Sequence, residues 1–228
     1  MESARQSVQR LWSHTAREFV SDFPFLAAVA LVVVLPGKLL LQFLLYLADV
    51  PPEGIAAYFL FYLSDLLLGA LVAPATIYGL TAKLDQGKLP PLSECLGAGL
   101  RLWRRMFWNL IKVEITVGLW SLLLFVPGII MMVRLSLTDP VAALEIREPD
   151  PLARSRELTE GHRLRIFLVL LPLGILGLAG TYLAFRWVGW SDYSRWVIAI
   201  SDSLYAVGTQ LAIVAMLLIY RERKAAVR

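Results

Sequence analysis

Five ionisable residues lie inside apolar runs of this 228-residue sequence, where ion pairing, proton transfer or ion conduction is the chemistry available to them. A charged side chain at the centre of a bilayer costs at least about 2.5 kcal/mol unless it is paired or hydrated. Three acids and two bases nearly balance, which predicts internal ion pairs. The five residues are Lys38, Asp65, Arg134, Asp139 and Asp202.

We expect Arg134 to be the hub of this buried polar network, with Asp65 or Asp202 as its partner. Asp139 follows Arg134 by five residues, which places the two on different faces of a regular helix unless the next proline bends it. Glu145 lies near the cytoplasmic boundary and completes the predicted set. Such a network either fixes helix register or forms a pathway for an ion or small solute, and the structural role is favoured.

Motifs of enzymes and metal sites are missing from the sequence. There is no Gly-x-Ser-x-Gly elbow, no His-Glu-x-x-His and no P-loop. Cys95, His14 and His162 are the only soft ligands, which disfavours zinc and iron–sulfur sites. Paired carboxylates such as Asp139 and Glu145 are weak evidence of acid–base catalysis. We therefore expect a non-enzymatic protein without a cofactor.

The elements that must position these residues are membrane-spanning helices. The chain is 58% hydrophobic with a mean hydropathy of +0.65, against roughly 45–50% apolar residues in soluble domains. Apolar segments near the ~20 residues that span a bilayer predict six spans. They cover residues 23–47, 55–80, 107–126, 129–144, 166–188 and 197–220. The predicted fold class is all-α, a polytopic membrane protein whose six transmembrane helices form one domain over residues 21–228.

Residues 1–20 predict an amphipathic helix. One stripe at i, i+3, i+4, i+7 and i+11 holds Val8, Leu11, Trp12, Thr15 and Phe19. Arginines lie off this stripe. The helix would lie in the membrane interface or cap the bundle on its cytoplasmic side, and the sequence favours neither.

The distribution of lysine and arginine predicts the orientation. The N-terminal helix, the second and fourth connections and the tail carry 18 of the 22 basic residues. Six spans with both termini in the cytoplasm place all of them on one side. Residues 113–144 form either two spans, the alternative we favour, or one re-entrant hairpin, because both have cytoplasmic flanks. The net charge of +4 is too small to indicate nucleic acid.

A cluster of arginine and tryptophan precedes the third predicted span. It contains Arg101, Trp103, Arg104, Arg105 and Trp108. This composition suits the headgroup layer of an anionic leaflet, either as ordinary interfacial anchoring, which is favoured, or as specific lipid recognition. The expected partners are membrane lipids, including anionic ones, and a membrane-protein partner or a second copy of the chain.

Asp150-Pro151 predicts the start of a short helix over residues 151–160, with Asp150 as N-cap, and Gly161 fits its C-terminal cap.

About a third of the chain, from Gly97 to Phe167, carries a set of residues with a family pattern. The set is Trp103, Pro127-Gly128-Ile129, Arg134, Pro140, Glu145, Leu152-Ala153-Arg154-Ser155 and Leu158-Thr159-Glu160-Gly161. It resembles the membrane domain found N-terminal to some bacterial glycerophosphoryl diester phosphodiesterases, and related uncharacterised six-span bacterial inner-membrane proteins. In the fused enzymes the chemistry belongs to a soluble barrel domain, for which this chain has no segment of suitable length and polarity.

The resemblance implies a multi-pass protein of the bacterial inner membrane without phosphodiesterase activity. We expect a non-enzymatic module that binds lipid or a protein partner, as a scaffold or in envelope homeostasis. The alternative is a transporter of a small solute or ion, or a transporter subunit, that uses the network of Arg134 and the buried aspartates.

Overall fold

The computed structural model describes residues 2–51, 54–188 and 194–227, without the side chains of residues 2–5, 125, 178, 181–188, 194–195 and 227. Helices account for most of these residues, which confirms the all-α prediction. In chain order they are α1 (Glu2–Ser21), α2 (Phe23–Leu47), α3 (Ile55–Gln86), α4 (Leu92–Leu123), α5 (Phe125–Leu135), α6 (Thr138–Leu144), α7 (Pro151–Thr159), α8 (Arg163–Val188) and α9 (Ser194–Val227).

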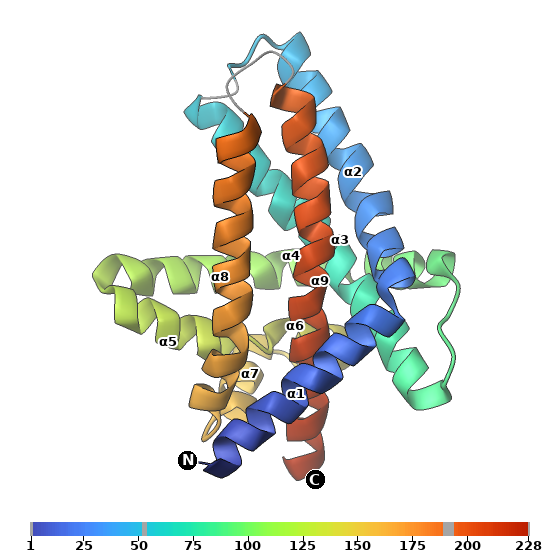
Figure 1. Cartoon of the computed structure of the whole chain (residues 1–228), viewed down its shortest axis with the longest axis vertical. Helices are drawn as coiled ribbons and strands as arrows, with labels where there is room; N and C mark the ends of the chain where they lie inside the picture. The colour runs from blue at the N-terminus through green and yellow to red at the C-terminus, as the bar shows by residue number, and fades with distance from the viewer. Residues whose placement is uncertain (1, 52–53, 189–193, 228) are drawn as a thin grey trace.

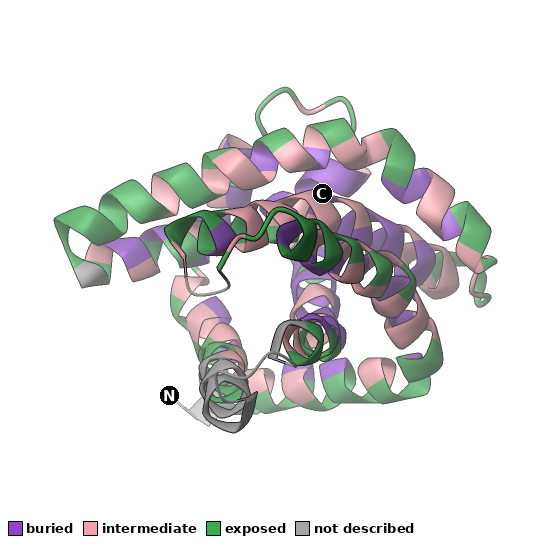
Figure 2. Cartoon of the chain, turned by 90° about the horizontal axis from the view of Figure 1, so that it is seen from above, coloured by how far each residue is buried: buried purple, intermediate pink, exposed green. Residues whose placement is uncertain are grey.

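The long helices run in two directions. α8 and α9 stand upright, α2 and α3 run beside them at a tilt, and α1 and α4 lie across them (Figure 1). Seen from above, α8 and α9 are viewed nearly end-on whereas α1 and α4 are viewed along their lengths (Figure 2). α2 packs mainly on α9, and α3 packs mainly on α4. The upright bundle thus carries two crossing helices on its lower half.

Five helical stretches are long and apolar enough to cross a membrane. They are Phe23–Leu47, Ile55–Gln86, Leu92–Leu123, Val126–Leu144 and Trp196–Ala226. The predicted span over residues 166–188 coincides with α8, but residues 181–188 lie outside the side chains that the structure describes. The chain is therefore an all-α protein with five candidate membrane spans, as expected of a multi-pass membrane protein.

The predicted fourth span, residues 129–144, is not one continuous helix, because α5 and α6 replace it. Ser155 of α7 fills the break. Its hydroxyl donates to the carbonyl of Arg134 at 2.9 Å and accepts the N–H of Leu137 at 3.2 Å. Backbone polar groups in apolar surroundings must find partners within the protein. A side chain from a later helix therefore satisfies the backbone groups that the break leaves free, and Pro140 removes the helical hydrogen bond to Ser136 at the same place.

The short helix α7 begins and ends with the residues predicted to cap it. The Asp150 carboxylate accepts the N–H groups of Leu152 and Ala153, both at 3.1 Å. Gly161, with φ of +73°, follows the helix in the left-handed region that glycine favours. The predicted helix is confirmed as Pro151–Thr159.

The predicted apolar stripe of α1 faces the protein. Leu11 and Thr15 are buried, and the other three members of the stripe pack against the main core. Lys83 of α3 holds the end of α1 through Glu18 at 3.0 Å and Asp22 at 2.8 Å. Of the two predicted alternatives, this packing corresponds to a cap on the bundle.

α3 and α4 approach closely at Gly99. A Cβ atom at Gly99 would lie 2.7 Å from the carbonyl oxygen of Leu71, whereas Gly97 faces open space. One glycine therefore permits the close crossing, because even a methyl group would meet the α3 backbone.

Candidate functional site: two charge networks and an apolar hairpin

A buried lysine joins three helices. The Nζ atom of Lys38 in α2 lies 2.6 Å from an oxygen of Asp65 in α3 and 3.2 Å from an oxygen of Asp202 in α9. The Lys38 side chain is 1% exposed, whereas those of Asp65 and Asp202 are 61% and 38% exposed. The ring of Phe61 lies 5.7 Å from the ammonium. An ammonium group removed from water needs such counter-charges, so this cluster ties the three helices together.

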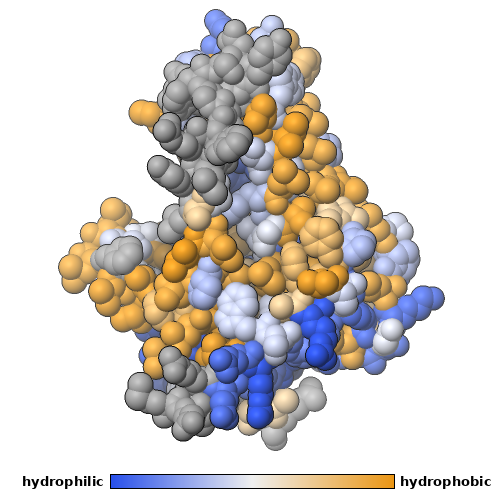
Figure 3. All heavy atoms as spheres, in the orientation of Figure 1, coloured by the Kyte–Doolittle hydropathy of each residue, from blue (hydrophilic) through white to orange (hydrophobic). Residues whose placement is uncertain are grey.

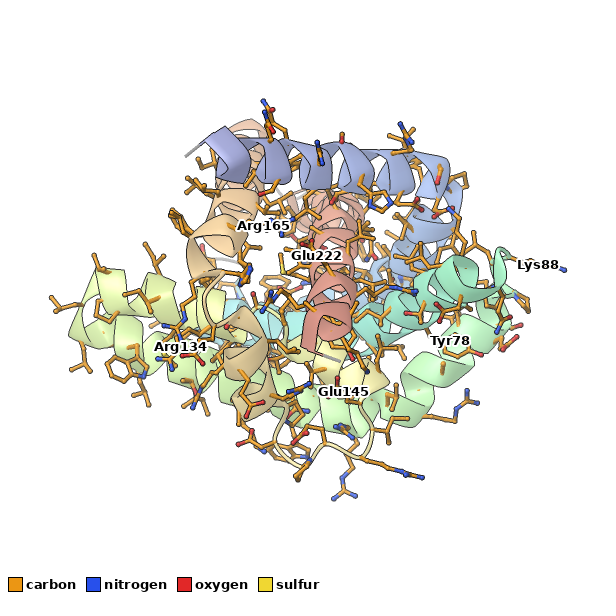
Figure 4. The ribbon with its side chains drawn as sticks, turned by 90° about the horizontal axis from the view of Figure 1, so that it is seen from below. Tyr78, Lys88, Arg134, Glu145, Arg165 and Glu222 are labelled. Carbon is orange, nitrogen blue, oxygen red and sulfur yellow. The ribbon has the colours of Figure 1, made fainter. Side chains whose placement is uncertain are left out.

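The prediction that Arg134 is the hub is wrong. Both carboxylates expected to pair with Arg134 pair with Lys38 instead. The Arg134 Nη1 atom lies 3.9 Å from the sulfur of Met131, and its Nε has no hydrogen-bond partner among the described residues. Figure 4 shows Arg134 at the end of α5, well apart from Glu145 near α9. Arg134 contributes to the fold through its carbonyl, which Ser155 binds.

Asp139 also stays outside the cluster around Lys38. Within the described part of the chain it makes no ion pair with Lys38 or Arg134. The predicted single network is thus not formed.

Gln42, a polar residue in the apolar run of α2, was not among the residues considered from the sequence. Gln42 is 1% exposed, and neither atom of its amide has a hydrogen-bond partner among the described residues. It follows Lys38 by four residues, so both lie on the buried stripe of α2 with Val34. An unpaired buried amide costs about 1–3 kcal/mol. Two polar residues spaced i, i+4 in an apolar helix indicate that this face of α2 is buried against other helices, and this face carries Lys38.

Glu145 forms a second network at the end of α9. One of its oxygens accepts hydrogen bonds from Tyr220 at 2.8 Å and lies 3.2 Å from Lys224, and the other lies 3.4 Å from Arg154. Burial raises the pKa of Glu145, but the hydrogen bonds of Tyr220 and Lys224 and the charges of Lys224 and Arg154 outweigh it. The pKa of Glu145 therefore lies below its ordinary value. This network holds the turn after α6 against α9.

Two of the predicted lipid-contacting residues are engaged within the protein. The indole N–H of Trp103 donates to the carbonyl of Leu67 at 2.9 Å. Arg105 donates to three backbone carbonyls of the turn at residues 145–148, two of them at 2.9 and 2.8 Å. The Trp103 N–H and both Nη atoms of Arg105 are thus bound within the protein, and the headgroup role of these two residues stays a prediction. Arg105 fixes the turn that carries Glu145.

The other members of the cluster face outward. Arg101 and Arg104 are exposed, and Trp108 is 54% exposed. The lipid-headgroup prediction for these three residues remains a prediction.

A long apolar hairpin projects from the bundle. It comprises the second half of α4 and α5 (residues 111–135) and is referred to below as the α4–α5 hairpin. Its exposed apolar residues include Ile115, Leu119, Leu122, Leu123, Leu124, Val126 and Ile130. Figure 3 shows a hydrophobic lobe projecting to the left, above the hydrophilic lower end. A contiguous apolar surface of this kind marks a site of contact with membrane or protein.

The tip of the hairpin lies slightly earlier than predicted. α4 ends at Leu123 and α5 already contains Pro127-Gly128, which we expected to form the turn. Gly128 packs on Ser121 with no room for a side chain, which allows the two helices to lie together.

The described residues contain no group of three or more His, Cys, Asp or Glu side chains arranged to hold a metal ion. No protein-family model, no curated protein and no solved structure matches this chain.

Proposed function

We propose that this chain is a non-enzymatic, lipid-binding module of the bacterial inner membrane. The observation that carries the proposal is the α4–α5 hairpin, which crosses the direction of the upright helices and whose exposed apolar end projects to the side beyond α8 (Figure 1). Leu122 at its end is 85% exposed. Burial in acyl chains would remove this surface from water at about 25 cal/mol per Å². The hairpin thus has the form of an element that engages one leaflet.

In this proposal four helices cross the membrane, namely α2, α3, α8 and α9. The α4–α5 hairpin takes the place of the third and fourth spans and lies within the cytoplasmic leaflet. Lysine and arginine counts fit this arrangement as well as six spans, because both flanks of the hairpin stay on the basic side. Exposed Arg101 and Arg104 then lie at the level of anionic headgroups.

The proposal includes kinship with the membrane domain of glycerophosphoryl diester phosphodiesterase type. Several residues of the family pattern form contacts that stabilise the fold of this chain. Ser155 bonds to the carbonyl of Arg134, Glu145 anchors the turn to α9, and Gly161 ends α7. Structural duties for these residues support a role as a module without chemistry of its own.

Native mass spectrometry of the detergent-purified chain tests the proposal by counting retained phospholipids. Replacing Leu122 and Leu123 by Gln should reduce the count, because the hairpin end becomes polar. Leu204→Gln, at an apolar position of α9 that is 61% exposed, is the matched control. Wild-type protein without retained phospholipid, or a hairpin variant with an unchanged count, would refute lipid binding by the hairpin.

A second candidate function is transport of a small solute or ion. The cluster of Lys38, Asp65 and Asp202 favours it, because two partly exposed carboxylates meet a buried ammonium inside candidate membrane spans. Gln42, whose amide has no partner among the described residues, lies one helical turn after Lys38 on the same buried stripe. Solute-dependent flux in proteoliposomes that Asp65→Asn abolishes would support transport. Equal flux from empty vesicles would exclude it.

A further inference from the structure

A cavity of about 480 Å³ lies beneath α1, at the end of the bundle where α8 begins and α9 ends. Its lining includes Arg10, Leu11 and His14 of α1, Arg165 of α8 and Glu222 of α9. Seen from below, Arg165 and Glu222 lie close together beneath α1 (Figure 4). Figure 3 shows that this lower end of the molecule is hydrophilic. The cavity therefore opens where a membrane protein meets the headgroup layer.

The lining carries an excess positive charge. Arg165 and Glu222 neutralise each other through two contacts of 2.5 and 2.9 Å. Arg10 is exposed and makes no ion pair among the described residues. The Nε atom of Arg165 is buried and has no hydrogen-bond partner in the part of the chain that the structure describes. One uncompensated guanidinium and one unused donor of a second guanidinium suit an anion with several oxygens.

An apolar track leads away from the same cavity. On α8, residues three, seven, ten and eleven positions after Arg165 are exposed, namely Leu168, Pro172, Ile175 and Leu176. This spacing places them on one face of the helix. The track from Arg165 to Leu176 is roughly 16 Å long at 1.5 Å per residue. It therefore matches half of the roughly 30 Å hydrocarbon layer.

We propose that this cavity binds the phosphate of an anionic glycerophospholipid, with one acyl chain along the α8 track. Arg10 and Arg165 hold the phosphate, and Leu11 borders the glycerol and first methylenes. An anionic lipid neutralises the excess positive charge of the lining. A zwitterionic lipid carries a positively charged headgroup beside its phosphate, which the arginines repel. This site deepens the proposed lipid-binding function and rests on it.

The test is a titration of the purified full chain with phosphatidylglycerol or phosphatidylcholine of identical acyl chains, followed by native mass spectrometry. Arg10→Gln is compared with Arg17→Gln, an exposed arginine of the same helix that does not line the cavity. We expect Arg10→Gln to weaken phosphatidylglycerol binding about fivefold, and Arg17→Gln to leave it unchanged. Leu168→Gln should weaken binding of the long-chain lipid through the track.

Three results would overturn the site. The first is equal binding of phosphatidylglycerol by the Arg10→Gln and Arg17→Gln variants. Lipid that the wild type then retains is bound outside the cavity and still supports the proposed function. The second is equal binding of the two lipids by the wild type. The third is displacement of the lipid by glycerol 3-phosphate at equal concentration, which would identify a soluble phosphate as the ligand. Absence of any retained phospholipid would refute the proposed function as well.

Discussion

Removal of both carboxylates around Lys38 should destabilise the protein far more than removal of either one. Asp65→Asn leaves the ammonium 3.2 Å from Asp202, and Asp202→Asn leaves it 2.6 Å from Asp65. Because both aspartates are more than a third exposed, each single change should cost about 1 kcal/mol or less. The double variant leaves a lysine that is 1% exposed without a counter-charge, and should lose about 3–5 kcal/mol.

Unfolding in mixed detergent and dodecyl sulfate micelles, followed by circular dichroism, measures these differences. Adding Lys38→Met to the double variant should restore most of the loss, because the charge that needs a partner is gone. Asp85→Asn, which removes an exposed partner of Arg221, is the control and should change little. A double variant whose loss equals the sum of the single losses, or a triple variant as unstable as the double, would refute the role of Lys38 as hub.

Three further predictions concern local contacts. Gly99→Ala should lower the free energy of unfolding by about 1–3 kcal/mol, because the new methyl group would lie 2.7 Å from the α3 backbone. Gly97→Ala, at a position that faces open space, should be neutral or stabilising in the same micelle assay. The pKa of Glu145 is lower in the folded protein than in the unfolded chain, so its carboxylate stabilises the fold fully above the unfolded pKa of about 4.3. This stabilisation is lost as the pH falls through the folded pKa. The free energy of unfolding should therefore fall less on acidification for Glu145→Gln than for the wild type. Arg105→Ala should free the 145–150 turn and speed amide hydrogen exchange there; unchanged exchange would contradict the clamp.

Features encoded by neighbouring residues were predictable from the sequence. The bounds of α2 agree with the predicted span, because one apolar run sets both ends. The cap of α7 was also predictable, since Asp150 accepts hydrogen bonds from residues two and three positions ahead.

The partner of each buried charge was not predictable in the same way. Lys38, Asp65 and Asp202 come from three helices, and their pairing depends on the relative heights of those helices after packing. Arg134 seemed equally suitable by composition, yet it lies near the end of α5, where no described carboxylate reaches it. Ser155 posed the same difficulty, because its contact with the break between α5 and α6 joins residues 18 and 21 positions apart.

The direction of the α4–α5 hairpin was likewise hidden from the sequence. Charge counts place both of its flanks on one side whether it crosses the membrane or lies in one leaflet. Its path depends on how α4 packs on α3, including the close crossing at Gly99, and hydropathy does not report packing. Length and composition therefore identify α4 as a candidate span while its packing lays it across the bundle.

The tail of α9 carries charged residues that contact four different parts of the chain. Four consecutive residues bind four different partners: Arg221 pairs with α3 at 2.5 Å, Glu222 with α8, Arg223 with the last turn of α7 at 3.1 Å, and Lys224 with the turn after α6 at 3.2 Å. Successive side chains of a helix point about 100° apart, so a short basic segment can clamp everything around it. The positive-inside rule counts Arg221, Arg223 and Lys224 of this segment, so the basic residues that predict a cytoplasmic C-terminus also hold the end of α9 against its neighbours. We therefore expect Arg221→Gln to weaken the contact of α9 with α3 without changing the predicted orientation, because most of the basic residues on that side remain.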